Sequence, residues 1–379
     1  MSRDQDLPAQ TGKHGFPSSV AEVTTDWLTD ALSASRALEG GRVASFDAEP
    51  IGQGVGLMGL LHRITLTYEG GTGPNSVVLK LPADHEATRF VTRTFEFYRK
   101  EVAFYRTAAE MTPIATPHCL AAEHDPESDD FVLLLEDLSD ATVHSQLDGC
   151  PPELAELAVK ALARHHATFW ESPAFATNLS WLPCGWDPPL PQGVQHGVAT
   201  AWEPFLNAFG DRVDDDIRSV GERFPAAAAQ MMTFPERQTT LCHADYRLDN
   251  LFFKEDGAGT DPEVVAIDWQ ICVRTVGGYD LGYFLSQSLT VDDRRKHETR
   301  LCETYLSTLA ESGIDYPMDL LWEDYRRTAL FCLCYPIQAG GGVELVNERA
   351  VQLVGEMLDR VVTTIRDLDA VELMPESGP

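Results

Sequence analysis

Apolar positions recur with two different periods along this chain, and the change of period separates a helix from strands. Residues 20–38 place their apolar side chains at helical spacing. Residues 64–68 (Ile-Thr-Leu-Thr-Tyr) alternate apolar and polar, and residues 76–81 (SVVLKL) are β-branched and apolar. A turn rich in Gly and Pro separates these two runs, which predicts a β-hairpin.

The helical period returns beyond the hairpin and dominates the second part of the chain. Residues 88–110 are predicted to form one helix and residues 131–135 (FVLLL) a strand, and residues 154–169 again repeat at helical spacing. A Pro- and Trp-rich segment at 173–191 is predicted to be a long ordered loop. Further helices are expected at 202–209, 215–232, 281–289, 292–311, 320–335 and 348–369.

These elements predict an α+β, bilobal architecture. We expect a flexible tail at 1–19, a small β-rich lobe at 20–137 and a large, mainly helical lobe at 138–379. At 379 residues the chain is long enough for two such lobes, each with its own core.

Two short motifs in the helical part carry the chemistry. Residues 241–253 (LCHADYRLDNLFF) and 264–270 (VVAIDWQ) each set isolated polar residues between apolar runs, which indicates a buried loop and strand. Asp245 and Asn250 are close enough in sequence for one loop to direct both at a shared point. Together with Asp268 they offer hard oxygen ligands, which suit Mg²⁺ and phosphoryl transfer and do not suit zinc.

The pattern HxDxxxxN followed by an Asp with apolar neighbours resembles the aminoglycoside phosphotransferase-like kinases, and most closely their ecdysteroid kinase-like and choline kinase-like branch. The resemblance covers about residues 20–360. It implies a protein-kinase-like fold that uses ATP and Mg²⁺ to phosphorylate a hydroxyl group of a small molecule. It also implies that His243 braces the catalytic loop, that Asp245 is the catalytic base, and that Asn250 and Asp268 bind Mg²⁺.

The resemblance implies a nucleotide-binding set in the small lobe as well. Lys80 in SVVLK would contact the phosphates, and Glu101 would be its ion-pair partner, with Glu96 as the alternative. The glycine loop would be 52–59, with Gly52, Gly54 and Gly56, because glycines let backbone N–H groups approach phosphate oxygens. The adenine hinge would follow the strand at 131–135 and comprise Glu136, Asp137 and Leu138.

Other features depart from the protein-kinase pattern or leave alternatives open. Ala244 stands where a His-Arg-Asp triplet has arginine, and no Asp-Phe-Gly follows, so a protein kinase with a phosphorylated activation loop is not expected. Asp280 resembles a structural aspartate of the family. His165 and His166 are expected to pack inside a helix. Three tryptophans are expected to be core or loop anchors and are also the candidates for the acceptor pocket: Trp181, Trp186 and Trp202.

The composition narrows the partners. A formal net charge of −30 argues against nucleic acid and against an anionic membrane surface as partners. The acidic excess is spread evenly on both sides of Asp137, so it marks a well-hydrated surface and does not identify a cationic substrate.

Nothing near the first residues resembles a secretory signal peptide, and the eight cysteines show no CxxC pair. We therefore expect free thiols and a cytoplasmic protein, and we do not expect a zinc site.

Three functions remain in view. The first is the small-molecule kinase, whose acceptor stays open among aminoglycosides, choline-like amines, steroids, hydroxyacyl compounds and sugars. A hydroxyacyl-type kinase is a specific variant, because one such branch often has a run like residues 246–250 (YRLDN). The second is a non-catalytic nucleotide-binding protein with the same fold, and the third is a His/Asp metal hydrolase. The sequence leaves the oligomeric state open.

Overall fold

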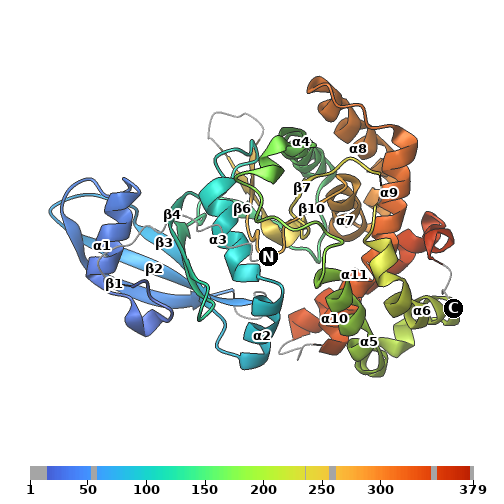
Figure 1. Ribbon diagram of the computed structural model, residues 1–379, viewed down its shortest axis with the longest axis horizontal. Coiled ribbons are helices and arrows are strands. Elements are labelled where there is room, and N and C mark those ends of the chain that lie inside the picture. Colours follow the sequence, from blue (N-terminus) through green and yellow to red (C-terminus); the bar gives the residue numbers. More distant parts are fainter. Residues whose placement is uncertain (1–14, 53–57, 235, 256–261, 343–347, 376–379) are drawn as a thin grey trace. The chain divides into compact units, whose positions relative to one another are not determined.

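The computed structural model describes residues 15–52, 58–234, 236–255, 262–342 and 348–375, and it divides into two compact units (Figure 1). Unit 1 comprises residues 1–111, 116–141 and 267–271; unit 2 comprises residues 112–115, 142–266 and 272–379. The short segment around Asp268 therefore belongs to the same unit as the β-rich part, although it lies far along the sequence. The expected small β-rich lobe and large helical lobe are both present, and the mixed α and β fold class is confirmed.

Unit 1 is built on a five-stranded antiparallel sheet in the order β1-β2-β3-β5-β4. The hairpin expected from the alternating pattern is present, with β2 paired to β3. The strand β1 precedes them and was not predicted. The strands are β1 (Arg42–Ile51), β2 (Gly59–Glu69), β3 (Ser76–Pro82), β4 (Cys119–Asp125) and β5 (Asp130–Glu136).

Alternation along the inner strands gives the sheet two buried faces. On β3, Val77 and Leu79 join a core with Leu28 and Leu32 of helix α1 (Thr25–Ala34). Lys80 points to the opposite face, where its ammonium contacts Glu101 on helix α3 (Phe97–Thr107). Successive side chains of a strand face opposite sides, so α1 and α3 cover the two faces of one sheet.

Two helices expected to be continuous are broken in unit 1. Residues 88–110 form α2 (Glu86–Thr94) and α3, separated at Glu96, whose φ of 55° is left-handed. The turn contains neither Gly nor Pro, and the helical spacing of apolar residues continues across it. The sequence therefore gives no sign of the break. The first helix is likewise shorter than expected, because Thr24 caps α1 by accepting a hydrogen bond from the N–H of Trp27 after a short 3-10 turn at Val20–Glu22.

Unit 2 is mainly helical and contains two small sheets. One pairs β7 (Thr240–Cys242) with β10 (Val273–Thr275), and the other has the order β6-β8-β9, formed by β6 (Thr142–Val143), β8 (Leu251–Lys254) and β9 (Glu263–Ala266). The helices are α4 (Pro152–Phe169), α5 (Leu190–Phe209), α6 (Asp215–Met231), α7 (Gly278–Ser288), α8 (Val291–Glu311), α9 (Met318–Phe331), α10 (Cys334–Gly342) and α11 (Glu348–Asp367). Short 3-10 turns lie at Pro173–Ala176, Gly210–Arg212, Leu248–Asn250 and Ala370–Leu373.

The helix expected at 320–335 is divided into α9 and α10, and proline explains the division. Pro336 has no N–H, and its ring would clash with the carbonyl of Cys332 in a continuous helix. The chain therefore starts a new helix, in which Pro336 lies in the first turn. The helix expected at 202–209 instead begins at Leu190, so it takes in the end of the predicted Pro/Trp-rich loop.

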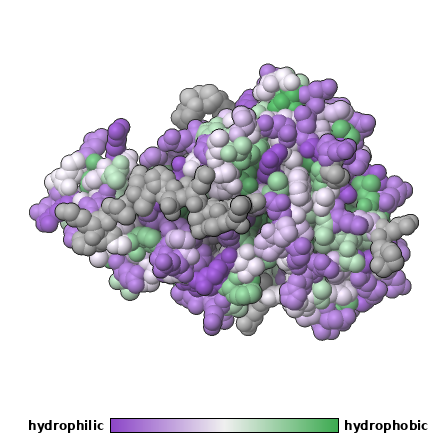
Figure 2. Space-filling view, in the orientation of Figure 1, coloured by the Kyte–Doolittle hydropathy of each residue, from purple (hydrophilic) through white to green (hydrophobic). Residues whose placement is uncertain are grey.

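The surface follows the acidic composition. Figure 2 shows that polar residues cover most of the visible face and that apolar residues appear there only in small patches. Among the helices of the described residues, none is both long enough and apolar enough to span a membrane. All eight cysteines are free, as expected, and six of them are buried.

Candidate functional site

An ionic cluster lies on the α3 side of the sheet in unit 1, with Lys80 and Glu101 buried and Asp268 partly exposed. The Nζ of Lys80 is 2.8 Å from a carboxylate oxygen of Glu101 and 2.8 Å from Oδ1 of Asp268. Glu101 is 1% exposed, and Glu96 instead pairs with Arg99 on the surface. The structure therefore joins Lys80 to Glu101, as the sequence favoured, and adds Asp268 as a second partner.

Burial and charge act against each other at Lys80. Burial by itself lowers the pKa of this ammonium, but the carboxylates of Asp268 and Glu101 raise the pKa well above its ordinary value. Lys80 is therefore positively charged at neutral pH. Burial also raises the pKa of Glu101, to about 7, although the charge of Lys80 acts to lower it. Two carboxylates face one ammonium, and carboxylate oxygens suit a bound cation.

The segment that carries Asp268 is held in a strained conformation. Asp268 has a φ of 65°, and such a backbone costs about 1–3 kcal/mol for a residue other than glycine. The adjacent Trp269 is 1% exposed and stacks on Phe104 of α3, with ring centroids 3.9 Å apart. The amide of Gln270 donates to the second carboxylate oxygen of Asp268 at 3.3 Å. Packing on α3 and this hydrogen bond fix the orientation of Asp268.

The expected glycine loop is described only in part. Gly52, the first residue of the expected loop, adopts a φ of 67°, which favours glycine. Gly54 and Gly56 lie outside the described residues, so their contact with phosphate stays a prediction.

The expected hinge residues have structural partners in unit 1. Asp137 accepts hydrogen bonds from Arg63 at 2.8 Å and from Ser76 at 2.6 Å. Burial alone would raise the pKa of Asp137, but these donors lower it below its ordinary value. Glu136 ends β5, and Leu138 is buried. Contact of these three residues with adenine stays a prediction.

In unit 2, the loop between β7 and β8 directs Asp245 and Asn250 at each other. The side-chain amide of Asn250 donates to the backbone carbonyl and to Oδ2 of Asp245, both at 2.9 Å. Two further donors reach Oδ1 of Asp245, Tyr283 Oη at 2.8 Å and Arg247 Nε at 3.1 Å. Burial by itself raises the pKa of Asp245, but the charge of Arg247 and the hydrogen bonds hold it below its ordinary value.

The backbone of this loop is fixed by Asp280 on α7. Its carboxylate accepts from the backbone N–H of His243 at 2.6 Å and from that of Ala244 at 2.8 Å. Ala244 has a φ of 66°, so the brace stabilises a strained turn beside Asp245. His243 is fully buried, and its Nδ1 accepts from the N–H of Asp245 at 3.2 Å. This contact fits the expected bracing role of His243.

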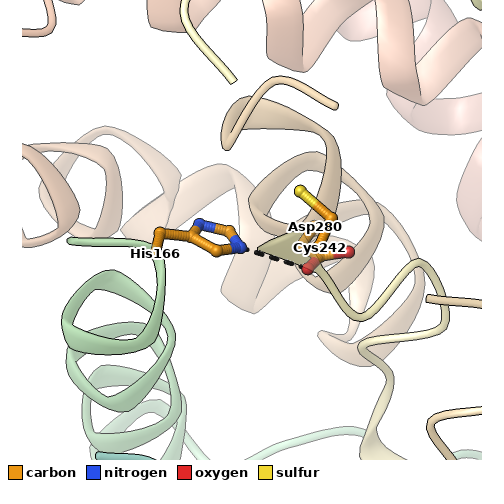
Figure 3. A group of neighbouring side chains, drawn as sticks. All are labelled: His166, Cys242 and Asp280. Atoms are coloured by element: carbon orange, nitrogen blue, oxygen red, sulfur yellow. Dashed lines mark hydrogen bonds and ion pairs between the residues drawn. The ribbon is translucent and has the colours of Figure 1, made fainter. Parts of the chain in front are cut away.

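A buried histidine and a cysteine surround the same aspartate. Figure 3 shows His166, from α4, directed at Asp280, with Cys242 close to them. The Nε2 of His166 is 3.2 Å from Oδ2 of Asp280, and its Nδ1 is 2.7 Å from the hydroxyl of Tyr305. As expected, His166 is a buried residue of a helix, and its side chain is held by hydrogen bonds.

This His-Cys-Asp cluster does not fit a metal ion. Burial raises the pKa of Cys242 well above its ordinary value, so its sulfur keeps the proton, and it contacts the carbonyl of Val276 at 3.3 Å. A zinc ligand would be a thiolate. The carboxylate of Asp280 is already occupied by the loop amides and by His166. The cluster is therefore a hydrogen-bonded brace.

The residues expected to bind Mg²⁺ do fit a hard cation. Because the amide nitrogen of Asn250 is used by Asp245, its amide oxygen is the atom left for a cation, and no hydrogen bond to it is found among the described residues. Asp268 offers carboxylate oxygens from the ionic cluster of unit 1. Oxygen donors of these two kinds are what Mg²⁺ prefers.

Sequence reasoning missed three contributors to these sites. Tyr283 of α7 and Arg247 contact Asp245. Gln270, two residues after Asp268, contacts the carboxylate of Asp268. The spacing of Gln270 after Asp268 was visible in the motif IDWQ, whereas nothing in the sequence links Tyr283 to residue 245. Trp202 is a core residue stacked on Phe205.

Comparison with solved structures identifies the fold. The GDP complex of wild-type aminoglycoside 2'-phosphotransferase-IIIa matches with a TM-score of 0.51 and 14% identity, covering 90% of this chain and 98% of that chain. Choline kinase from Cryptosporidium parvum Iowa II matches with a TM-score of 0.53 and 10% identity, covering 87% and 92%. Plasmodium vivax ethanolamine kinase matches with a TM-score of 0.51 and 10% identity, covering 86% and 82%. The fold of this chain is therefore that of protein-kinase-like phosphotransferases.

The comparison with curated proteins gives no match. The sequence does match the ecdysteroid kinase-like family over residues 53–171 and 192–315, which is more than half of the chain and includes the motifs around Lys80, Asp245 and Asp268. The chain belongs to the ecdysteroid kinase-like family, a family of kinase-like small-molecule phosphotransferases.

Proposed function

We propose that this protein is an ATP- and Mg²⁺-dependent kinase that phosphorylates a hydroxyl group of a small molecule. The observation that carries the proposal is the cluster of Lys80, Glu101 and Asp268. A fold gains little stability from ion pairs that are withdrawn from water, because desolvation offsets their attraction. A ligand that carries phosphates and a cation accounts for a lysine and two carboxylates at this place.

ATP would supply the transferred phosphoryl group, and Mg²⁺ would neutralise charge on its phosphates. In unit 1, Lys80 would donate to phosphate oxygens while Glu101 keeps its ammonium in place, and Asp268 would hold the metal with a carboxylate oxygen. In unit 2, Asn250 would contribute its amide oxygen.

Asp245 would receive the acceptor hydroxyl. Its pKa lies below the ordinary value, so it is a weak base and is ionised at neutral pH. A carboxylate of this kind orients the hydroxyl by accepting its hydrogen bond and takes the proton as the new bond to phosphorus forms. The Arg247 and Tyr283 contacts keep it ionised inside the protein.

The test is a screen for ADP release with five acceptor classes: aminoglycosides, choline-like amines, steroids, hydroxyacyl compounds and sugars. Asp245→Asn serves as the blank. We expect one class to give turnover in the wild type, with a loss of at least about 100-fold in the variant. A melting curve of the variant separates this loss from unfolding.

Nucleotide binding is tested independently by thermal shift with ATP or GTP, with and without Mg²⁺. Stabilisation that requires Mg²⁺ is expected. Stabilisation that ignores Mg²⁺, together with no ADP release from any acceptor class, would refute the kinase proposal and favour a non-catalytic nucleotide-binding protein.

A further inference from the structure

The carboxylate of Asp245 is unequally occupied. An ionised carboxylate has two oxygens and about four lone-pair positions. Tyr283 and Arg247 both donate to Oδ1, at 2.8 Å and 3.1 Å, whereas among the described residues Oδ2 receives only the amide of Asn250, at 2.9 Å. Oδ1 is therefore filled by the protein, and Oδ2 keeps a lone pair for a further donor.

The hydroxyl of Tyr283 cannot leave this position easily. Tyr283 is 2% exposed, and its ring stacks on Tyr335 with centroids 4.6 Å apart and planes 7° from parallel. The hydroxyl of Tyr335 is held in turn by that of Tyr279. Rotating the ring of Tyr283 would break this stack and leave a buried phenol without a partner, which costs free energy.

One helix controls both parts of the loop. Tyr283 and Asp280 are three residues apart on α7, and positions three apart share one face of a helix. Asp280 fixes the backbone of residues 243 and 244, and Tyr283 fixes the side chain of residue 245. The position of Asp245 therefore depends on the packing of α7.

We propose that Tyr283 is a positioning residue for phosphoryl transfer: its hydroxyl holds Oδ1 of Asp245, so that Oδ2 is the oxygen that receives the acceptor hydroxyl. This inference rests on the proposed function, in which Asp245 orients the acceptor. Tyr283 is not assigned a contact with either substrate, and its effect passes through Asp245.

Tyr283→Phe tests the role, because it keeps the ring in the stack and removes only the hydroxyl. A hydrogen bond to a charged group contributes about 1.5–3 kcal/mol, so kcat is expected to fall by about 10–100-fold. The KM for nucleotide should not change, because Tyr283 and Oδ1 of Asp245 are not among the residues proposed to hold the nucleotide or its metal. Tyr325→Phe is the matched control: it removes a buried phenol hydroxyl that donates to the carboxylate of Glu298 instead of that of Asp245, and kcat should stay within about 2-fold of the wild type.

A double-mutant cycle separates positioning from a general effect on folding. In the Asp245→Asn background, Tyr283→Phe should lower the residual kcat by less than about 3-fold, because the group through which it acts is already gone. An equal fold-loss in both backgrounds, or a Tyr283→Phe enzyme as fast as the wild type, would overturn the inference.

The same four proteins are also compared by urea unfolding, which requires no activity. The midpoint losses of Asp245→Asn and Tyr283→Phe should be less than additive, since both break one contact. Additive losses would overturn the inference even in an active enzyme. If the wild type transfers phosphate to none of the acceptors, the proposed function fails. If the two substitutions are then coupled only in urea unfolding, the contact between Tyr283 and Asp245 serves stability, and the positioning role is overturned.

Discussion

Replacing Asp280 by Asn should destabilise the protein, because Asp280 is fully buried and serves several donors at once. Its Oδ2 is shared by the N–H of His243 and by His166, and its Oδ1 accepts from the N–H of Ala244. An amide group has the same shape but only one acceptor oxygen. In either orientation of the amide, its NH₂ group takes the place of a carboxylate oxygen and faces a backbone N–H, and two donors cannot form a hydrogen bond with each other.

The magnitude follows from the groups left unpaired. With the amide oxygen at the Oδ2 position, the N–H of Ala244 and the new NH₂ group oppose each other, and each unsatisfied buried group costs about 1–3 kcal/mol. Loss of the buried negative charge returns part of this cost. The free energy of unfolding of Asp280→Asn should therefore fall by about 2–4 kcal/mol, a large share of the 5–15 kcal/mol typical of folded proteins.

Urea unfolding followed by circular dichroism measures this loss. Asp315→Asn is the matched control, because it is the same substitution at an exposed position in the loop before α9; its midpoint should equal that of the wild type. If Asp280→Asn unfolds at the same urea concentration as Asp315→Asn, the brace does not stabilise the loop and the reasoning is refuted.

Three other perturbations test separate features. Burial raises the pKa of Asp324 from 3.8 to about 6, so the contribution of this carboxyl group to stability is fully present below pH 3.8 and is lost as the pH rises through 6. Melting curves of Asp324→Asn should therefore show the same stability as the wild type at pH 4. At pH 8 the variant should be more stable by up to about 3 kcal/mol. An added Cβ at Gly221 would lie 2.1 Å from the ring of Trp202, so Gly221→Ala should lose about 1–3 kcal/mol in urea unfolding, whereas Gly210→Ala, with no atom closer than 3.9 Å, should lose none. Glu101→Gln should weaken ATP binding by about 10-fold in a thermal-shift titration while leaving the ammonium of β3 paired to its second carboxylate, and unchanged ATP affinity would contradict the assigned role of the cluster.

Local patterns predicted those parts of the fold and site that depend on neighbours in sequence. Alternation identified β2 and a run of β-branched and apolar residues identified β3, and the placement of Lys80 within SVVLK put it on the strand where the structure has it. The spacing of Asp245 and Asn250 predicted one loop that directs both to a shared point, and the two side chains are hydrogen-bonded. Helix breaks were predicted poorly, since Glu96 turns the chain without a Gly or Pro and α1 starts only at the Thr24 cap.

Contacts between distant residues were decided by the tertiary structure. The 38 positions from Asp245 to Tyr283 and the 114 positions from His166 to Asp280 contain no pattern that pairs them. The contact between Lys80 and Asp268, which lie 188 positions apart, is likewise not marked by any pattern in the sequence. Periodicity records which side of an element is buried, but not which element covers it. The sequence by itself thus determined the family, the strands around Lys80 and the loop that carries Asp245, while the packing of α7 and α4 decided how that loop and its carboxylate are held.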